Sequence, residues 1–297
     1  MIYIYTKILF RYLYSMWNVN TLLKLGFKKR LSSLNIDEIK KDTDTLFILG
    51  SGASINTINE KGWETIKKNN SIGLNYWPIH DFVPSLLMFE MPRGERGKVF
   101  YDVLRKKKDL YLKTPLIFKG LYKNRRDFYG IERVKSLFDE DLIDTIYLSH
   151  ELSIPGRNQK EFAKGLKHLD AMGFFSDKKQ ISSLGQYRGT VTCAIIFGIK
   201  AGYKNIVLCG VDLNDTKYFY EESAQYYKDK GIEVPISGQT TTIHKTNIAL
   251  PNVLPVSNAI VLLNEFFEKK YNGKLYVANK KSALFPDLEF YNLSDEV

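Results

Sequence analysis

Short apolar runs alternate with amphipathic segments along most of the chain. The run Thr45–Leu49 is rich in β-forming residues and ends at a glycine, which predicts a buried strand. The same pattern predicts further strands at residues 71–74, 86–89, 116–118, 145–148, 205–209 and 274–277. Helical composition predicts helices at 61–68, 97–108, 159–172, 190–201 and 256–270. Such alternation is typical of an α/β protein with a mainly parallel sheet.

No repeat, linker or low-complexity segment interrupts this series, so residues 41–297 are predicted to form one Rossmann-like domain. The segment Thr45–Leu74 has the strand, loop, helix and strand that open a doubly wound sheet. Residues 1–40 precede this series and form a separate, basic and amphipathic segment.

The N-terminal segment has two interpretations. Between Met1 and Arg30 there are six basic residues and no acidic one. Lys7 and Arg11 interrupt the apolar run before it reaches the ~20 residues of a membrane span, and no signal-peptide cleavage site follows. The segment is either a helix that lies on an anionic membrane or a helix docked on the protein's own core. The basic cluster at 28–30 favours membrane contact, which predicts a cytoplasmic protein on the inner face of a bacterial membrane.

The charge balance indicates an anionic partner. Lys and Arg number 43 against 33 Asp and Glu, a net charge of +10, which suits a nucleotide, a phosphorylated sugar, nucleic acid or an acidic membrane. The two cysteines, Cys193 and Cys209, lie in apolar runs and are expected to pack as small hydrophobic residues in a reducing compartment. The four histidines are scattered, so no metal site is predicted.

Two loops are expected at the carboxyl edge of the sheet, where open α/β sheets bind ligands. Gly50, Ser51 and Gly52 follow the first predicted strand, and their amides could face a phosphate. The pattern lacks both the third glycine of a dinucleotide fingerprint and the lysine of a P-loop, so an ordinary strand-to-helix turn is an open alternative. The second loop ends at Asp212, after the run from Gly202, and the two loops could share one crevice.

Both loops resemble motifs of one enzyme family. Residues 48–54 match a stretch of the pattern I-x-G-N-G-P-S, with Ser51 in place of asparagine, and residues 202–212 match G-Y-K-x-I-x-L-x-G-I-D. The chain therefore resembles the bacterial sialyltransferases of glycosyltransferase family 42, of the Campylobacter lipooligosaccharide type. The resemblance covers roughly residues 45–285. It implies a GT-A-variant fold and transfer of a nonulosonic acid from a CMP-activated donor to a glycan hydroxyl, with inversion and without a metal or other cofactor.

The resemblance also assigns residues. His244 would match the histidine base, and Tyr218 and Tyr220 would match tyrosines that bind the departing phosphate. The residues implied at the donor are Gly50, Ser51, Gly52, Ser54, Asn75, Glu90, Arg188, Thr190 and Asp212. Ser51 stands in place of an asparagine and Glu90 lies near the position of another donor-contacting asparagine, which leaves the donor open between sialic acid and an analogue such as Kdo.

The chemistry of these residues fits such roles, although each has a simpler explanation. A histidine can take the proton of an attacking hydroxyl near neutral pH, and phenols can stabilise charge on a leaving phosphate. From the sequence alone a surface-loop histidine is the favoured explanation for His244, and only the resemblance reverses that preference; the tyrosines could serve packing. His80 and Asp81 follow the second predicted strand and are weaker candidates for the acceptor side.

The expected partners are a nucleotide-sugar donor and a glycan or glycolipid acceptor, with no nucleic acid; a homo-oligomer is left open. A transferase that uses another donor, such as a UDP sugar, is the alternative within enzymes, and magnesium dependence would identify it. A non-catalytic basic module that binds nucleotides or polyanions is the alternative outside enzymes, and strong salt dependence would identify it.

Overall fold

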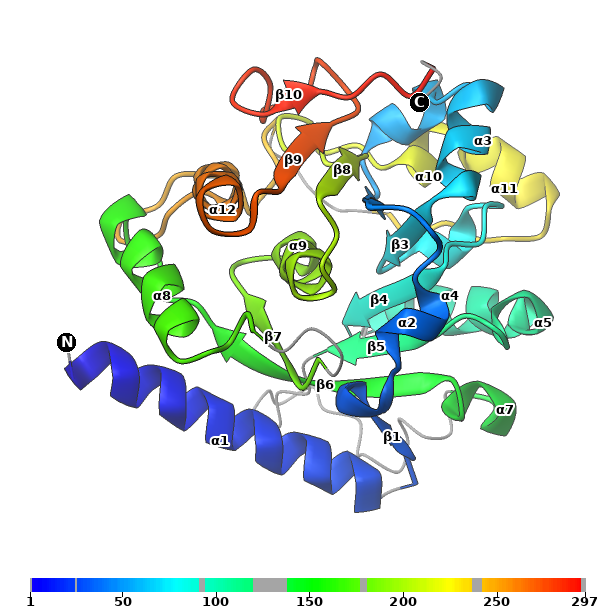
Figure 1. The fold of residues 1–297 in the computed structure, drawn as a ribbon. Coiled ribbons are helices and arrows are strands. Elements are labelled where there is room, and N and C mark those ends of the chain that lie inside the picture. The colour runs from blue at the N-terminus through cyan, green and yellow to red at the C-terminus, as the bar shows by residue number, and fades with distance from the viewer. Residues whose placement is uncertain are drawn as a thin grey trace.

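The computed structural model describes residues 2–24, 26–90, 94–119, 138–176, 181–236 and 242–294. Within these ranges, all strand pairings of one ten-stranded sheet are parallel, in the order β1-β6-β5-β4-β3-β2-β8-β9-β10, with β7 beside β6 (Figure 1). The predicted single α/β domain with a mainly parallel sheet is confirmed.

The strands span the following residues: β1 Lys29–Arg30, β2 Thr45–Leu49, β3 Asn70–Leu74, β4 Leu86–Glu90, β5 Leu116–Lys119, β6 Ile146–Ser153, β7 Ser183–Gln186, β8 Asn205–Cys209, β9 Lys274–Val277 and β10 Glu289–Phe290. All seven strands predicted from the apolar runs are present. The short strands β1, β7 and β10 were not predicted, because two to four residues carry too little periodicity to be distinguished from loops.

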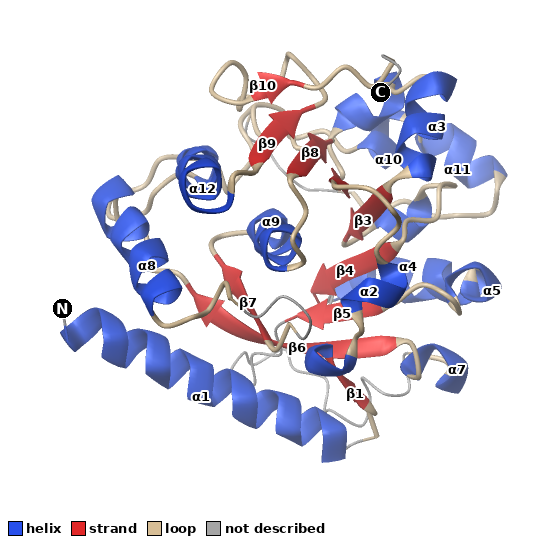
Figure 2. Ribbon diagram, in the orientation of Figure 1, coloured by secondary structure: helices blue, strands red, loops and turns tan. Residues whose placement is uncertain are grey.

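The longer helices are α1 Ile2–Lys24, α3 Glu60–Lys68, α4 Gly94–Lys106, α8 Gln159–Ala171, α9 Thr190–Lys200 and α12 Val256–Tyr271. Shorter ones are α2 Ile36–Ile39, α5 Lys108–Tyr111, α7 Glu140–Ile143, α10 Phe219–Glu222 and α11 Ala224–Asp229. Figure 2 shows α8, α9 and α12 on one side of the sheet and α3, α4, α10 and α11 on the other. The five predicted helices correspond to α3, α4, α8, α9 and α12.

Alternate strand residues supply two hydrophobic cores. Along β2, Leu46 and Ile48 enter the core beneath α9 and α12, while Phe47 and Leu49 enter the core beneath α4. Successive side chains of a strand point to opposite faces, so a strand buried on both faces must be apolar throughout. This explains why β2 has no polar position in its interior.

Residues 1–40, predicted as a separate segment, contribute to the same sheet. Helix α1 packs along β6, and β1 pairs with β6 at Tyr147 and Leu148. Ile8, Val19 and Leu22 on the inner side of α1 are buried. In the described part of the chain, no helix combines the length and the apolar content that a membrane span requires.

Candidate functional site

One cavity lies where the order of the strands in the sheet reverses. From β2 the chain proceeds through β3, β4, β5 and β6 on one side, whereas β8, β9 and β10 lie on the other. The loops after β2 and β8 therefore meet at the carboxyl edge of the strands, the usual position of ligand sites in such sheets. A cavity of about 420 Å³ opens there. It is lined by Gly50, Ser51, Gly52, Leu74, Asn75, Tyr76, Glu90, Arg96, Arg188, Gly189, Thr190, Val191, Gly210, Val211, Asp212, Leu213, Asp215, Lys217, Tyr218, Tyr220, His244, Lys245 and Thr246.

The glycine turn after β2 packs tightly against the loop after β8. The Gly50 amide donates to the Cys209 carbonyl at 2.7 Å, and the Gly52 amide donates to the Gly210 carbonyl at 2.8 Å. A Cβ atom at Gly50 or Gly52 would clash with the Gly210 carbonyl oxygen, so both positions need glycine. The expectation that these amides face a phosphate is wrong for Gly50 and Gly52, because the neighbouring loop accepts both hydrogen bonds.

Asp212 joins the same two loops. Its carboxylate accepts hydrogen bonds from the Ser54 hydroxyl at 2.6 Å, the Ser54 amide at 3.1 Å and the Asn279 side chain at 3.2 Å. Asp212 lines the cavity, but Ser54 does not, since its hydroxyl is turned toward Asp212. These contacts indicate that Ser54 fixes the conformation of the glycine turn from outside the cavity.

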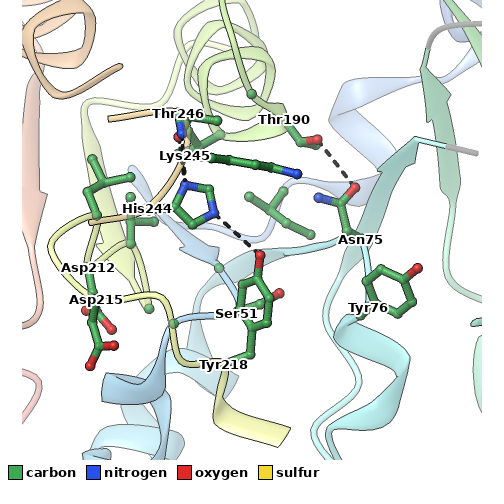
Figure 3. A pocket seen from close by; sticks show the side chains of 18 of the residues that line it. Ser51, Asn75, Tyr76, Thr190, Asp212, Asp215, Tyr218, His244, Lys245 and Thr246 are labelled. Atoms are coloured by element: carbon green, nitrogen blue, oxygen red, sulfur yellow. Dashed lines mark hydrogen bonds between the residues drawn. The ribbon is translucent and has the colours of Figure 1, made fainter. Parts of the chain in front are cut away.

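Asn75, Thr190 and Glu90 come together on one wall of the cavity. Asn75 follows β3 with a positive φ of 52°, a conformation that asparagine tolerates better than most residues. Its side-chain oxygen accepts from the Thr190 hydroxyl at 3.3 Å and from the Glu90 amide at 3.2 Å. Its side-chain nitrogen points toward the cavity (Figure 3).

His244 lies on the opposite wall. Its Nδ1 is 2.8 Å from the Thr246 hydroxyl, and its Nε2 is 3.4 Å from the Tyr218 hydroxyl (Figure 3). Burial, together with the cations Lys245 and Arg188, lowers the pKa of His244 to about 4. The imidazole is therefore neutral at physiological pH, the form that can accept a proton.

A group of phenols lies next to His244. The rings of Tyr218 and Tyr220 stack at 5.2 Å, Tyr220 lies 6.2 Å from Tyr76, and the Arg96 guanidinium lies 5.1 Å from the Tyr76 ring centre. The buried Tyr220 hydroxyl has no well-aligned hydrogen-bond partner in the described part of the chain. Burial raises the pKa of Tyr76 to about 12, so this phenol keeps its proton and can donate.

Arg188 secures the loop that carries His244. Its guanidinium donates to the carbonyls of Lys245 at 3.1 Å, Ile248 at 3.2 Å and Leu254 at 3.4 Å. The residue lines the cavity as expected, but these contacts also make it a positioning residue for the histidine loop.

The weaker candidates His80 and Asp81 do not line the cavity. The His80 ring packs between Trp63 at 4.8 Å and Trp77 at 4.7 Å, and burial lowers its pKa to about 4. Asp81 pairs with Lys230 at 2.6 Å and accepts from the Tyr226 hydroxyl. His80 therefore serves packing, and Asp81 forms an ion pair with the residue that follows α11.

Sequence reasoning did not assign a role to Tyr76, Lys217, Lys245 and Thr246, which line the cavity, or to Lys119, which lies behind Glu90. Lys245 extends from the histidine loop across the cavity toward Asn75 (Figure 3). The adjacency of Lys245 and Thr246 to His244 was a usable signal, whereas nothing in the sequence connects Lys119 to the cavity. Across the described ranges, no group of three or more His, Cys, Asp or Glu side chains could hold a metal ion.

The comparisons with known proteins found similar structures only. No family model matches the sequence, and no curated protein matches it. The monofunctional α-2,3-sialyltransferase Cst-I from Campylobacter jejuni is 17% identical with a TM-score of 0.46, covering 86% of this chain and 84% of that chain. The sialyltransferase CstII from the same organism, in complex with CMP-3FNeuAc, is 16% identical with a TM-score of 0.45, covering 85% and 88%. With TM-scores below 0.5, these likenesses do not by themselves assign an activity to this chain.

Proposed function

We propose that this protein is a metal-independent, inverting glycosyltransferase of the family 42 type. It transfers a nonulosonic acid, sialic acid or an analogue such as Kdo, from a CMP-activated donor to a hydroxyl of a cell-surface glycan or glycolipid. The observation that carries the proposal is the neutral imidazole of His244 beside the Tyr218 phenol, in a cavity at the point where the strand order reverses. The sequence motifs at 48–54 and 202–212 form the two loops of that cavity.

The proposed chemistry follows from the two walls of the cavity. The acceptor oxygen attacks the anomeric carbon while its proton moves to His244 Nε2, with Nδ1–H donating to the Thr246 hydroxyl. The bond from the anomeric carbon to the phosphate oxygen breaks, and its electron pair leaves with CMP. The phenols of Tyr218 and Tyr220 donate to the departing phosphate, each donor typically contributing about 3 kcal/mol. The nearby Arg96 and Lys217 supply positive charge to the same region.

Nucleotide binding is the most direct test. CMP at about 100 times its Kd should stabilise the protein by about 2.7 kcal/mol, seen as a rise of several degrees in Tm. The shift should persist in EDTA, while UDP and GDP should give smaller shifts. A shift with UDP that requires magnesium would favour the UDP-sugar alternative. No nucleotide shift, together with strongly salt-dependent polyanion binding, would favour the non-catalytic module.

We also propose that α1 contacts an anionic membrane with its outer face. Leu9, Phe10, Leu13 and Trp17 are exposed there, although the opposite face is docked on β6. The expected basic cluster is partly used inside the protein, since Lys28 pairs with Asp144 at 2.6 Å. Residues 1–30 contain six basic residues and no acidic one, which nevertheless favours anionic lipid over a second, equally positive copy.

Vesicle binding tests this face. Vesicles containing phosphatidylglycerol should sediment with the protein and shift Trp17 fluorescence to the blue, whereas pure phosphatidylcholine should bind less. The double variant Phe10→Ser, Leu13→Ser should lose binding, while Leu110→Ser, at an equally exposed leucine on α5, should not. Self-association without vesicle binding would assign the face to a second copy and contradict the proposal.

A further inference from the structure

A chain of buried polar groups runs beneath one wall of the cavity. Lys119, at the end of β5, has no exposed surface, and its Nζ lies 2.6 Å from Glu90 Oε1 and 3.8 Å from Glu151 Oε1. In the amide orientation that satisfies both neighbours, Gln186 donates to Glu151 Oε2 at 2.6 Å and accepts from Lys119 Nζ at 3.2 Å. The groups lie at the carboxyl ends of four adjacent strands or just inside them, from β4 to β7.

This arrangement is better explained by function than by stability. Burying an ion pair costs desolvation free energy, and well-packed apolar side chains of the same volume often stabilise a protein as much or more. The chain of groups ends at Glu90, whose side chain is 51% exposed and lines the cavity. These buried contacts hold the Glu90 carboxylate in one orientation at the cavity wall.

That carboxylate is charged at neutral pH. Burial by itself would raise the pKa of Glu90, but the ammonium of Lys119, the Thr190 hydroxyl and the cation of Lys245 outweigh it and hold the pKa below its usual value. Glu151 and Glu90 both raise the pKa of the Lys119 ammonium, which burial by itself would lower. The neighbouring His150 adds no positive charge, because burial and Arg30 lower its pKa. An ionised carboxylate accepts hydrogen bonds and donates none.

The position of Glu90 matches the sugar part of a nucleotide sugar. The glycine turn ends β2, Asn75 follows β3 and Glu90 ends β4. Since adjacent strands lie about 4.8 Å apart, Glu90 is two strands, or roughly 10 Å, from the glycine turn. A ligand that contacts both the glycine turn and Glu90 is therefore longer than a single phosphate group.

We propose that Glu90, ion-paired with Lys119, determines which donor sugar this enzyme accepts. It accepts hydrogen bonds from a hydroxyl or ammonium group of the transferred sugar and excludes donors that place an anionic group at that point. This inference rests on the proposed transfer from a CMP-activated donor, and it adds the kind of substituent that the sugar must carry.

The test is a cycle of donors and variants. Transfer from CMP-N-acetylneuraminic acid is compared with transfer from analogues that each lack one hydroxyl, using the wild-type protein and Glu90→Gln. With the wild type, the analogue that lacks the hydroxyl bound by Glu90 should have a kcat/KM about 10- to 100-fold lower than that of CMP-N-acetylneuraminic acid, because a hydrogen bond to a charged group is lost. The same analogue should lose only a few-fold with Glu90→Gln, whose amide is a weaker acceptor. Glu95→Gln is the matched control, since Glu95 is ion-paired with Lys98 at 2.7 Å but does not line this cavity.

The outcomes separate the two proposals. If removing each hydroxyl lowers kcat/KM by the same factor in the wild type and in Glu90→Gln, the inference about Glu90 is wrong while the proposed transfer stands. If the wild type transfers nothing from CMP-N-acetylneuraminic acid or CMP-Kdo, the proposed function is wrong and the inference falls with it. A CMP-induced rise in Tm for Glu90→Gln shows that the variant is folded and that its cavity is intact.

Discussion

Replacing His244 with alanine should lower the rate of sugar transfer by about 100- to 10,000-fold, the usual contribution of a general base. The Nε2 atom faces the cavity beside the Tyr218 hydroxyl, while Nδ1 is engaged with Thr246. No other imidazole among the described residues lines this cavity, so no neighbour can replace it. The measurement is the initial rate of CMP release from CMP-N-acetylneuraminic acid in the presence of an acceptor glycan.

Two controls make the His244 result specific. His168→Ala, on α8 and outside the cavity, should keep the wild-type rate. CMP should still raise the Tm of His244→Ala, because the imidazole acts on the acceptor hydroxyl and not on the nucleotide. Undiminished transfer by His244→Ala would refute the proposed mechanism even if CMP binds.

The pH dependence of kcat/KM also tests His244 as the general base. Because the pKa of His244 is lowered to about 4, the base is already neutral across the physiological range. The value of kcat/KM should therefore stay level from neutral pH downward and fall only as the pH approaches about 4, where the imidazole gains a proton. Lys245→Met removes one of the cations that lower this pKa, so it should move the fall to higher pH.

The local sequence predicted the elements that frame the site, because strands buried on both faces leave long apolar runs. Thr45–Leu49 and Asn205–Cys209 were located from such runs alone, and the loops after them do meet. Periodicity could not predict the hydrogen bonds that the two loops form with each other. The Gly50 amide is used by Cys209 and the Ser54 hydroxyl by Asp212, contacts between residues about 160 positions apart.

The limits of sequence reasoning are clearest at Arg188 and Lys119. Arg188 was expected at the donor, yet its guanidinium binds three carbonyls of the histidine loop, a role set by how that loop folds back. Lys119 ends an apolar strand, where a lysine ordinarily reaches solvent. Only the pairing of β5 with β4 and β6 places it between Glu90 and Glu151.

Replacing Lys119 with methionine should destabilise the protein by about 3 to 5 kcal/mol, the cost of leaving a buried charge without its partner. Glu151 is only 6% exposed and would lose its cationic partner beside an apolar side chain. Glu90 would lose its ion pair as well, but water in the cavity can hydrate its half-exposed side chain. The free energy of unfolding from urea titrations, compared at equal m-values, measures the loss.

A second substitution shows whether charge or packing causes that loss. Lys119→Met, Glu151→Gln removes the uncompensated buried charge while the amide can still bond to Gln186, so it should recover most of the stability that the single variant loses. Lys98→Met breaks an ion pair of similar length on the exposed surface of α4 and should cost less than about 1 kcal/mol. If the double variant is no more stable than Lys119→Met alone, the loss comes from the shape of the lysine side chain and not from its charge.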